Sequence, residues 1–183
     1  MLVPVKSFQR AKLRLAGALP AVERALLARA MATRVVHAAG ALPVAVVCDD
    51  PGVAEWAADL GAVVVETPGH GLNRAVHTGV DLLAAAGARR VIVAHADLAL
   101  AVELTWVARF DGVTLVPDRR DDGTNVLCLP TGGSFRFSYG PGSFRRHGHE
   151  ARRLGLPVRV VREPLLGHDV DVPADLLPLA AAP

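Results

Sequence analysis

The sequence predicts an α/β fold, with a mostly parallel central sheet flanked by helices in a single domain. Three observations support this prediction. Short apolar runs rich in β-branched residues alternate with longer helical patterns. The chain has 183 residues, the size of one domain with one core. Hydrophobic residues make up 51% of it but aromatic ones only 4%, which suits close packing of small aliphatic side chains between helices and a sheet. We expect the domain to span 1–176, with a C-terminal tail at 177–183.

The first half of the chain predicts the order βαβαβαβ. Near-continuous apolar runs, typical of strands buried on both faces, occur at Leu2–Val5, Pro43–Cys48, Ala62–Val65 and Val91–Ala94. Helical patterns lie between them at Ala21–Ala39, Gly52–Leu60 and Gly71–Ala86. Because parallel neighbours need a helical return, this alternation predicts a doubly wound sheet with right-handed crossovers. Ligands of such sheets bind beyond the carboxyl ends of the strands, where polar residues are therefore informative.

The second half is less regular. Further strands are predicted at Val113–Val116, Val126–Leu129 and Val158–Val161, and a helix at Gly142–Leu154. Gly and Pro gather in Thr131–Gly142, which indicates a surface loop before that helix. The last residues are rich in Ala and Pro and predict a frayed tail.

Composition and charge argue against several classes of protein. Lys and Arg total 20 and Asp and Glu 18, so the net charge of +2 lacks the cationic excess of a nucleic-acid binder. Cys48 and Cys128 belong to no CxxC pair, which argues against a zinc site or a disulfide framework and favours the cytoplasm. We expect neither a signal peptide nor a membrane span. A homodimer is predicted only because such dimers are common.

A basic loop follows the first predicted strand. Lys6, Arg10, Lys12 and Arg14 place four cations within nine residues, shortly before a helix. Such a loop could hold a polyphosphate by charge pairing, although a solvated basic turn has the same composition. The pattern GxxxxGK[ST] is missing, which argues against a P-loop nucleotide hydrolase.

Acidic residues mark two further positions. Asp97 ends a buried strand, where its carboxylate could bind Mg²⁺ or cap a following helix. Asp169 and Asp171 are two residues apart and would share one face of an extended segment. Asp175 falls outside this pair and is expected in a short helix that begins near Pro173.

Two polar segments suggest a second anion site. Pro117–Asn125 is a polar turn that enters a strand, and Ser138–Phe144 leads into a helix with small hydroxyl residues and glycines. Free N–H groups at a helix start favour bound anions, although an ordinary serine cap would look the same. A basic loop, two acidic positions and a second anion site together are what nucleotidyl transfer to a phosphorylated acceptor needs.

The motifs also resemble those of a known family. The stretches VPVK, AKLRL, GLNRAV, HADL, PDRRDDGTNVL, FSYGPGSF and DVDVPADL occur in order between Leu2 and Leu176. In order and spacing they resemble the 2-phospho-L-lactate or phosphoenolpyruvate guanylyltransferases of coenzyme F(420) biosynthesis. The resemblance implies a single-domain, Rossmann-like nucleotidyltransferase fold related to the molybdopterin guanylyltransferases. It also implies that GTP reacts with a small phosphorylated carboxylic acid of three carbons and that pyrophosphate is released.

The resemblance implies roles for particular residues. Lys6, Lys12 and Arg14 are expected to hold the GTP phosphates, and Gly71, Leu72 and Asn73 the guanine and ribose. Asp97, Asp169 and Asp171 are expected to bind Mg²⁺, and Lys12, Asp97 and Asp171 to be catalytic. Thr124, Gly140 and Ser143 are expected to seat the acceptor. One departure is Ala99, where the family commonly has Pro after ADL, and it affects the turn after Asp97 without removing a ligand.

The chemistry predicted is direct attack by an acceptor phosphate oxygen on the α-phosphorus of GTP, without a covalent enzyme intermediate. His95 is expected to be structural or to support a ligand residue, and not to be catalytic, while His147 and His149 are candidates for substrate contact. The acceptor stays open among phosphoenolpyruvate, which is favoured, 2-phospho-L-lactate and 3-phosphoglycerate. A nucleotidyltransferase for molybdopterin or a sugar phosphate is disfavoured because the chain opens with VPVKSFQRAK instead of a Gly-rich loop. A non-catalytic nucleotide-binding module is disfavoured because the acidic positions are intact.

Overall fold

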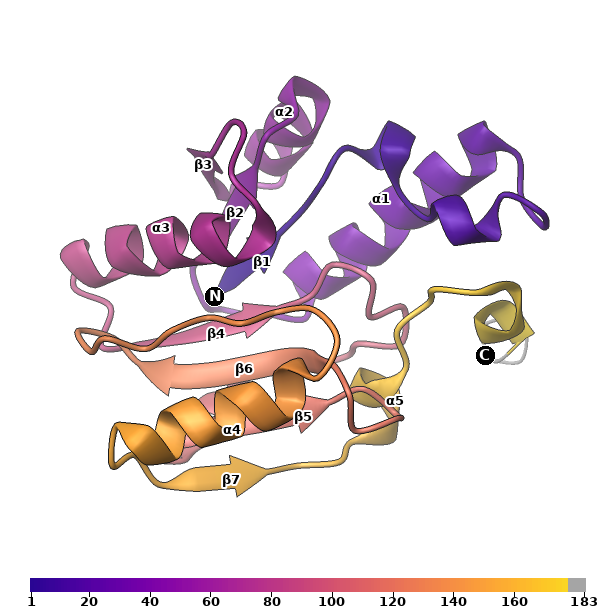
Figure 1. Ribbon diagram of the computed structural model, residues 1–183. Helices are drawn as coiled ribbons and strands as arrows, with labels where there is room; N and C mark the ends of the chain where they lie inside the picture. The colour runs from indigo at the N-terminus through magenta and orange to yellow at the C-terminus, as the bar shows by residue number, and fades with distance from the viewer. Residues whose placement is uncertain (178–183) are drawn as a thin grey trace.

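The computed structural model describes residues 1–177 and contains a seven-stranded sheet with the order β3-β2-β1-β4-β6-β5-β7. The strands are β1 (Leu2–Pro4), β2 (Ala45–Cys48), β3 (Val63–Glu66), β4 (Arg90–Ala94), β5 (Val113–Pro117), β6 (Thr124–Pro130) and β7 (Val158–Val160). Neighbouring strands are parallel, except that β6 runs antiparallel to both β4 and β5. The predicted, mostly parallel sheet flanked by helices is therefore confirmed (Figure 1).

Helices cover both faces of the sheet. They are α1 (Ala21–His37), α2 (Pro51–Asp59), α3 (Leu72–Ala85), α4 (Ser143–Arg153) and the short α5 (Pro164–Gly167). Successive residues of β1 point to opposite faces, so Val3 packs with α1 and α2 while Leu2 packs with α3. The core is thus two apolar layers, one on each face of the sheet.

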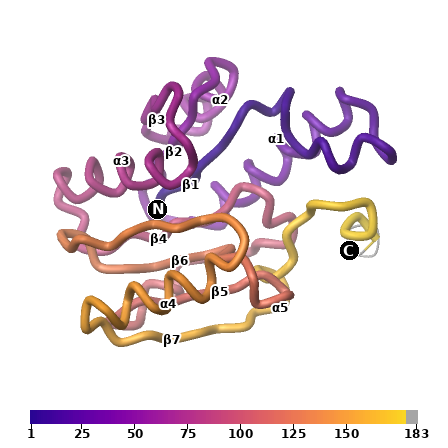
Figure 2. Tube along the Cα trace, in the orientation of Figure 1, coloured from indigo at the N-terminus to yellow at the C-terminus, as the bar shows by residue number. Residues whose placement is uncertain are grey.

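A third, small apolar cluster shapes the end of the sheet where ligands are expected. It joins Leu15, Met31, Ala99 and Val170, which come from the basic loop, α1, the segment after β4 and the C-terminal segment. Figure 2 shows the yellow C-terminal segment returning toward the indigo N-terminal loop. Val170 is fully buried between Asp169 and Asp171, so this anchor fixes the acidic segment beside the basic loop.

Close packing at the start of β5 leads to a stability prediction. A Cβ at Gly112 would lie 2.6 Å from Phe110 Cε1 and would overlap the backbone oxygen of Pro157, which accepts from Val113 N–H. Overpacking of this kind typically costs 1–3 kcal/mol, partly offset by lower entropy of the unfolded chain. We expect Gly112→Ala to lower the free energy of unfolding by about 1–2 kcal/mol in urea titrations. Gly17→Ala, where a Cβ meets open space, should change it by no more than roughly 0.5 kcal/mol; equal losses would contradict the packing argument.

In residues 1–177 we find no helix that is both long and apolar enough to cross a membrane. The predicted tail, Leu177 apart, lies outside the described residues.

Candidate functional site

A cavity of about 720 Å³ opens beyond the carboxyl ends of β1 and β4, where the topology predicted a ligand site. Its lining comes from segments 4–8, 10–14, 49–50, 70–72 and 95–97, completed by Ala28, Met31 and Asp171. The volume lies in the usual range for small-molecule sites. The structure therefore brings together the basic loop, the acid after β4 and the start of α3, which are far apart in the sequence.

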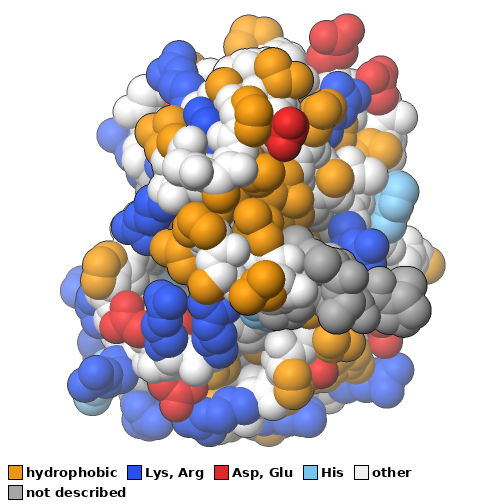
Figure 3. Space-filling view, turned by 90° about the vertical axis from the view of Figure 1, so that its right-hand side faces the viewer, with side chains coloured by type: hydrophobic (Ala, Val, Ile, Leu, Met, Phe, Trp, Pro, Cys, Tyr) orange, Lys and Arg blue, Asp and Glu red, His pale blue; other side chains and the backbone are white. Residues whose placement is uncertain are grey.

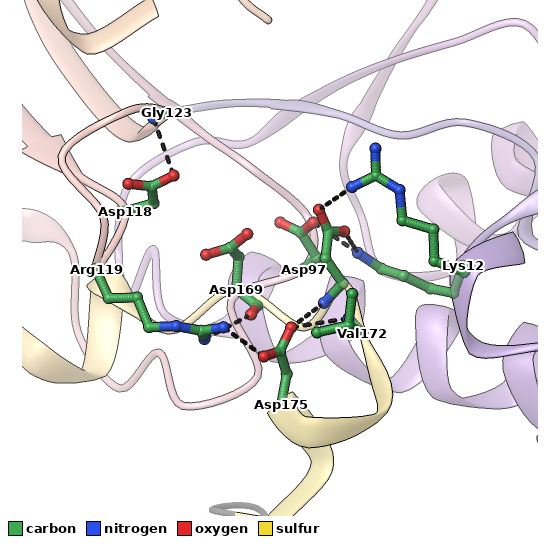
Figure 4. A network of polar contacts seen from close by, with 10 residues as sticks. Lys12, Asp97, Asp118, Arg119, Gly123, Asp169, Val172 and Asp175 are labelled. Carbon is green, nitrogen blue, oxygen red and sulfur yellow. Dashed lines mark hydrogen bonds and ion pairs between the residues drawn. The ribbon is translucent and has the colours of Figure 1, made fainter. Parts of the chain in front are cut away.

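Lys12 is the central cation of the cavity. Its Nζ donates to Asp97 Oδ2 at 2.7 Å and to Asp171 Oδ1 at 3.1 Å (Figure 4). The backbone at Lys12 is left-handed, with φ of 53°, and lies between two 3₁₀ turns, Phe8–Arg10 and Leu13–Leu15. Burial opposes the charge of Lys12, but the two carboxylates outweigh it and raise the pKa of this side chain. The ammonium therefore stays charged between the two acids.

The three predicted metal ligands differ in how they are compensated. Burial opposes ionisation of Asp97, but the neighbouring charge of Lys12 lowers the pKa of this carboxyl overall. Burial raises the pKa of Asp169, and the negative charges of Asp97 and Asp171 add to the rise. Asp97 Oδ1 is buried and has no hydrogen-bond partner within the described chain. Within residues 1–177, Asp97 Oδ1 thus lacks a hydrogen-bond donor, and burial and like charges disfavour the ionised form of Asp169.

These acids match a divalent cation in ligand chemistry. Carboxylate oxygens are the ligands that Mg²⁺ prefers, and an added cation would satisfy Asp97 Oδ1 and relieve the repulsion at Asp169. Over residues 1–177, however, no group of three acidic, His or Cys side chains converges with metal-ligand geometry. The ammonium of Lys12 instead lies between Asp97 and Asp171. The donor set therefore fits in charge and type, and the acids would have to rearrange around the ion.

Asp175 fixes the backbone of the acidic segment. This carboxylate is 2% exposed, and its Oδ2 accepts from Asp171 N–H at 2.7 Å and Val172 N–H at 2.8 Å. Arg119, from the turn after β5, forms an ion pair with its other oxygen and also reaches the backbone oxygen of Asp169 (Figure 4). The predicted short helix near Pro173 is confirmed as a 3₁₀ turn, Pro173–Leu176. The anchoring role was missed, although an acid three residues after an N-cap position is its usual signal.

The predicted nucleotide-binding residues fall into two groups. Lys6, Lys12, Arg14, Gly71 and Leu72 all line the cavity, and Arg14 also approaches Asp171, with Nη1 3.5 Å from Oδ2. Asn73 lies outside the lining. Its side-chain oxygen accepts from Tyr139 N–H at 2.6 Å, and its Nδ2 donates to Tyr139 O at 3.4 Å. Contact of Asn73 with guanine or ribose stays a prediction, and the structure gives its amide another partner.

The predicted acceptor residues gather in a second region behind the cavity. Thr124 begins β6, Ser143 begins α4, and both are 1% exposed, while Gly140 lies in the loop between them with φ of 113°. None of the three lines the cavity within the described chain. Tyr139 connects the two regions, because the centroid of its ring lies 5.0 Å from the ring centroid of His95, which lines the cavity. Acceptor binding by Thr124, Gly140 and Ser143 therefore stays a prediction. The region that these residues form lies next to the cavity and not in its lining.

Turns and helix side chains hold this second region in place. The carboxylate of Asp118 accepts hydrogen bonds from the backbone N–H groups of Arg120, Asp122 and Gly123 (Figure 4). These bonds hold the predicted polar turn together. Asp122 Oδ1 in turn accepts from Gly142 N–H at 3.0 Å. From α4, Arg146 donates to the backbone oxygen of Ser138 at 2.7 Å. The loop before α4 is therefore fixed from several elements.

His147 is fully buried beneath this loop. Its Nε2 accepts from Ser138 N–H at 2.9 Å, and its Nδ1 lies 3.0 Å from Thr124 Oγ1. Burial, helped by the charge of Arg146, lowers the pKa of this imidazole to about 4. The sequence suggested substrate contact for His147, whereas both ring nitrogens contact the protein. Nothing in the sequence around His147 indicates that its ring contacts Ser138 and Thr124.

The low pKa of His147 predicts an acid-sensitive fold. The unfolded chain protonates this ring near its ordinary value of 6.5, whereas the folded chain does so near 4. Unfolding therefore takes up a proton in this window, and we expect the free energy of unfolding to fall by about 2 kcal/mol between pH 7 and pH 5. His147→Gln should flatten the pH dependence in urea titrations, and His149→Gln, at an exposed position on α4, should leave it intact. The same slope in His147→Gln would assign the effect to other groups.

The chain is similar to known proteins over almost its full length. A family model described as "Guanylyl transferase CofC like" matches residues 1–181. A phosphoenolpyruvate guanylyltransferase of Sphaerobacter thermophilus is 38% identical, over 97% of this chain and 90% of the relative. One of Rubrobacter xylanophilus is 40% identical, over 98% and 92%. A 2-phospho-L-lactate guanylyltransferase of Methanothermobacter thermautotrophicus is 36% identical, over 96% and 81%.

Solved structures support the fold. A nucleotide-diphospho-sugar transferase structure from Desulfovibrio desulfuricans has a TM-score of 0.75 at 17% identity, with 97% of this chain and 84% of that chain covered. A nucleotidyl transferase from Methanothermobacter thermautotrophicus has a TM-score of 0.63 at 16% identity, over 98% and 95%. Identities this low show the fold alone, which agrees with the nucleotidyltransferase architecture that the motifs imply.

Proposed function

Because the chain belongs to the CofC-like guanylyl transferase family, we propose that it transfers GMP from GTP to the phosphate of phosphoenolpyruvate in coenzyme F(420) biosynthesis. Its relatives named for this acceptor and for 2-phospho-L-lactate make these two acids the first candidates. The observation that carries the proposal is the pairing of Lys12 with Asp97 and Asp171 inside the cavity. One cation and two acids that line a single cavity support the reaction of a triphosphate there.

In the proposed reaction an oxygen of the acceptor phosphate attacks the α-phosphorus of GTP. The new bond joins that oxygen to the α-phosphorus, and the bond from the α-phosphorus to the bridging oxygen breaks, so that pyrophosphate leaves. The acceptor phosphate is already an anion at neutral pH, so no general base is required. The main obstacle is repulsion between two polyanions. Lys6, Lys12 and Arg14 line the cavity and supply positive charge against it.

Mg²⁺ is part of the proposal. Asp97, Asp169 and Asp171 would hold the ion, with the orphaned Asp97 Oδ1 as one ligand. When bound, the ion neutralises phosphate charge and supports the departure of pyrophosphate. The positive charge of Lys12 lowers the pKa of Asp97 and so keeps that carboxyl group ionised.

Two further proposals concern the setting of the enzyme. We place it in the cytoplasm, in keeping with the two unpaired cysteines, Cys48 and Cys128. A homodimer also stays a proposal. Leu13, Val22 and Leu26 are exposed near the start of α1, and Figure 3 shows hydrophobic side chains between Lys and Arg side chains on that side of the molecule.

The experiment is an assay of pyrophosphate release with GTP and, separately, phosphoenolpyruvate, 2-phospho-L-lactate and 3-phosphoglycerate, with and without Mg²⁺. We expect release that depends on Mg²⁺ and on an acceptor, and that is fastest with phosphoenolpyruvate. ATP and CTP serve as matched controls for the base. GTP binding without release from any acid would favour a binding module, and release only with a sugar phosphate would favour the rival acceptor class.

A further inference from the structure

The protonation state of His147 follows from its surroundings. The backbone N–H of Ser138 can only donate, so Nε2 of His147, 2.9 Å away, must accept and cannot carry a proton. The single proton of the neutral ring is therefore on Nδ1, and it points at Thr124 Oγ1, 3.0 Å away. The other tautomer would set two donors against each other in a site where the imidazole has no solvent exposure.

This tautomer determines which hydrogen-bonding role is left to Thr124. Its hydroxyl oxygen accepts from His147, so its own proton is free to be donated elsewhere. Among the hydrogen bonds of residues 1–177, none uses the Thr124 hydroxyl as a donor to a protein acceptor. A hydroxyl fixed as a donor suits an anionic group, such as a phosphate or a carboxylate oxygen.

We propose that His147 is a positioning residue that orients the Thr124 hydroxyl as a hydrogen-bond donor to the acceptor acid and fixes the loop that carries Gly140. The proposal rests on the proposed function. It adds His147 to the residues on which acceptor binding depends, although His147 need not touch either substrate. It also assigns the Thr124 hydroxyl the role of hydrogen-bond donor.

The same loop is attached to the nucleotide side of the site. His147 holds it from α4 through Ser138 N–H, and Asn73 holds it from α3 through both backbone groups of Tyr139. Asn73 directly follows Leu72, which lines the cavity. If the contacts of His147 are removed, Asn73 still holds the loop on the nucleotide side. A His147 variant should therefore weaken binding of the acceptor acid more than binding of GTP.

A double-mutant cycle separates this role from a purely structural one. In His147→Gln the glutamine oxygen can still accept from Ser138 N–H, but no donor remains at the Nδ1 position. Thr124→Val removes the hydroxyl while keeping the shape. We expect each single variant to raise the KM for phosphoenolpyruvate about 10- to 100-fold, the range for one hydrogen bond to a charged group, with the KM for GTP within about twofold. The double variant should be no more than about twofold worse than Thr124→Val alone.

Controls keep the outcomes distinct. His37→Gln, at an exposed position at the end of α1 and outside the cavity lining, should match the wild type. Thermal unfolding with GTP titration identifies variants that have lost the fold. His147→Asn can keep a donor near Nδ1 but cannot accept from Ser138 N–H at the Nε2 position, so it tests the contact with the loop separately from the role of His147 in orienting Thr124. Multiplied single effects in the double variant, or equal rises in both KM values, would overturn it. Wild-type protein that releases no pyrophosphate with any of the acids would instead contradict the proposed function.

Discussion

Replacing Asp97 by asparagine is expected to lower kcat for pyrophosphate release by about a thousandfold, equivalent to roughly 4 kcal/mol of transition-state stabilisation. The change keeps the shape of the side chain but removes a charge that Lys12 compensates at 2.7 Å. It also changes the orphaned Oδ1, which is buried without a hydrogen-bond partner in residues 1–177 and which we proposed above as an Mg²⁺ ligand. Both the proposed Mg²⁺ site and the orientation of Lys12 are therefore lost together.

Asp81→Asn is the matched control for this prediction. Asp81 is exposed on α3, where it pairs with His77 away from the cavity. This variant should keep the wild-type rate, and both variants should unfold cooperatively in a thermal melt. A folded Asp97→Asn protein with more than roughly a tenth of the wild-type rate would show that Asp97 is not a catalytic ligand.

Replacing Lys12 by methionine is expected to lower kcat by about a hundredfold or more. The side chain is 11% exposed and lies between two carboxylates, so methionine fills its volume but removes the cation between Asp97 and Asp171, and only the exposed Arg14 still reaches Asp171. With its main compensating charge gone, burial should raise the pKa of Asp97. Breaking such a partly buried pair should also lower the free energy of unfolding by about 2 kcal/mol, measured in urea at neutral pH.

Two comparisons sharpen the Lys12 prediction. Arg159→Met removes an exposed cation from the edge strand β7 and should leave both rate and stability unchanged. Lys12→Gly relieves the left-handed backbone, so it should unfold at higher urea concentration than Lys12→Ala while both are equally inactive. If Lys12→Met keeps wild-type kcat at saturating Mg²⁺, the ammonium only occupies the place of the ion and takes no part in catalysis.

The sequence predicted the elements well because burial dictates their patterns. All eleven predicted strands and long helices are present, with ends displaced by no more than two residues. The antiparallel direction of β6 was not predictable, since an apolar run buried on both faces looks the same in either direction. The short α5 was missed because four residues, Pro164–Gly167, are too few to show a helical period.

The candidate site was predicted where it depends on strand ends and missed where it depends on distant contacts. Lys12, Asp97 and Asp171 follow from charges placed after β1, after β4 and in an extended segment, and the structure brings them together. Asn73 contacts a backbone 66 residues away, and Arg119 an acid 56 residues away. No local pattern encodes such partners, because a hydrogen bond of one side chain leaves no period in the sequence.

The most direct test of the proposed reaction is ³¹P NMR of the products that wild-type enzyme forms from GTP and phosphoenolpyruvate with Mg²⁺. We predict two mutually coupled diphosphate resonances from GMP joined to the acceptor phosphate, together with one equivalent of pyrophosphate. A product mixture of GDP with inorganic phosphate, or of GMP with pyrophosphate and unchanged phosphoenolpyruvate, would contradict guanylyl transfer to this acceptor.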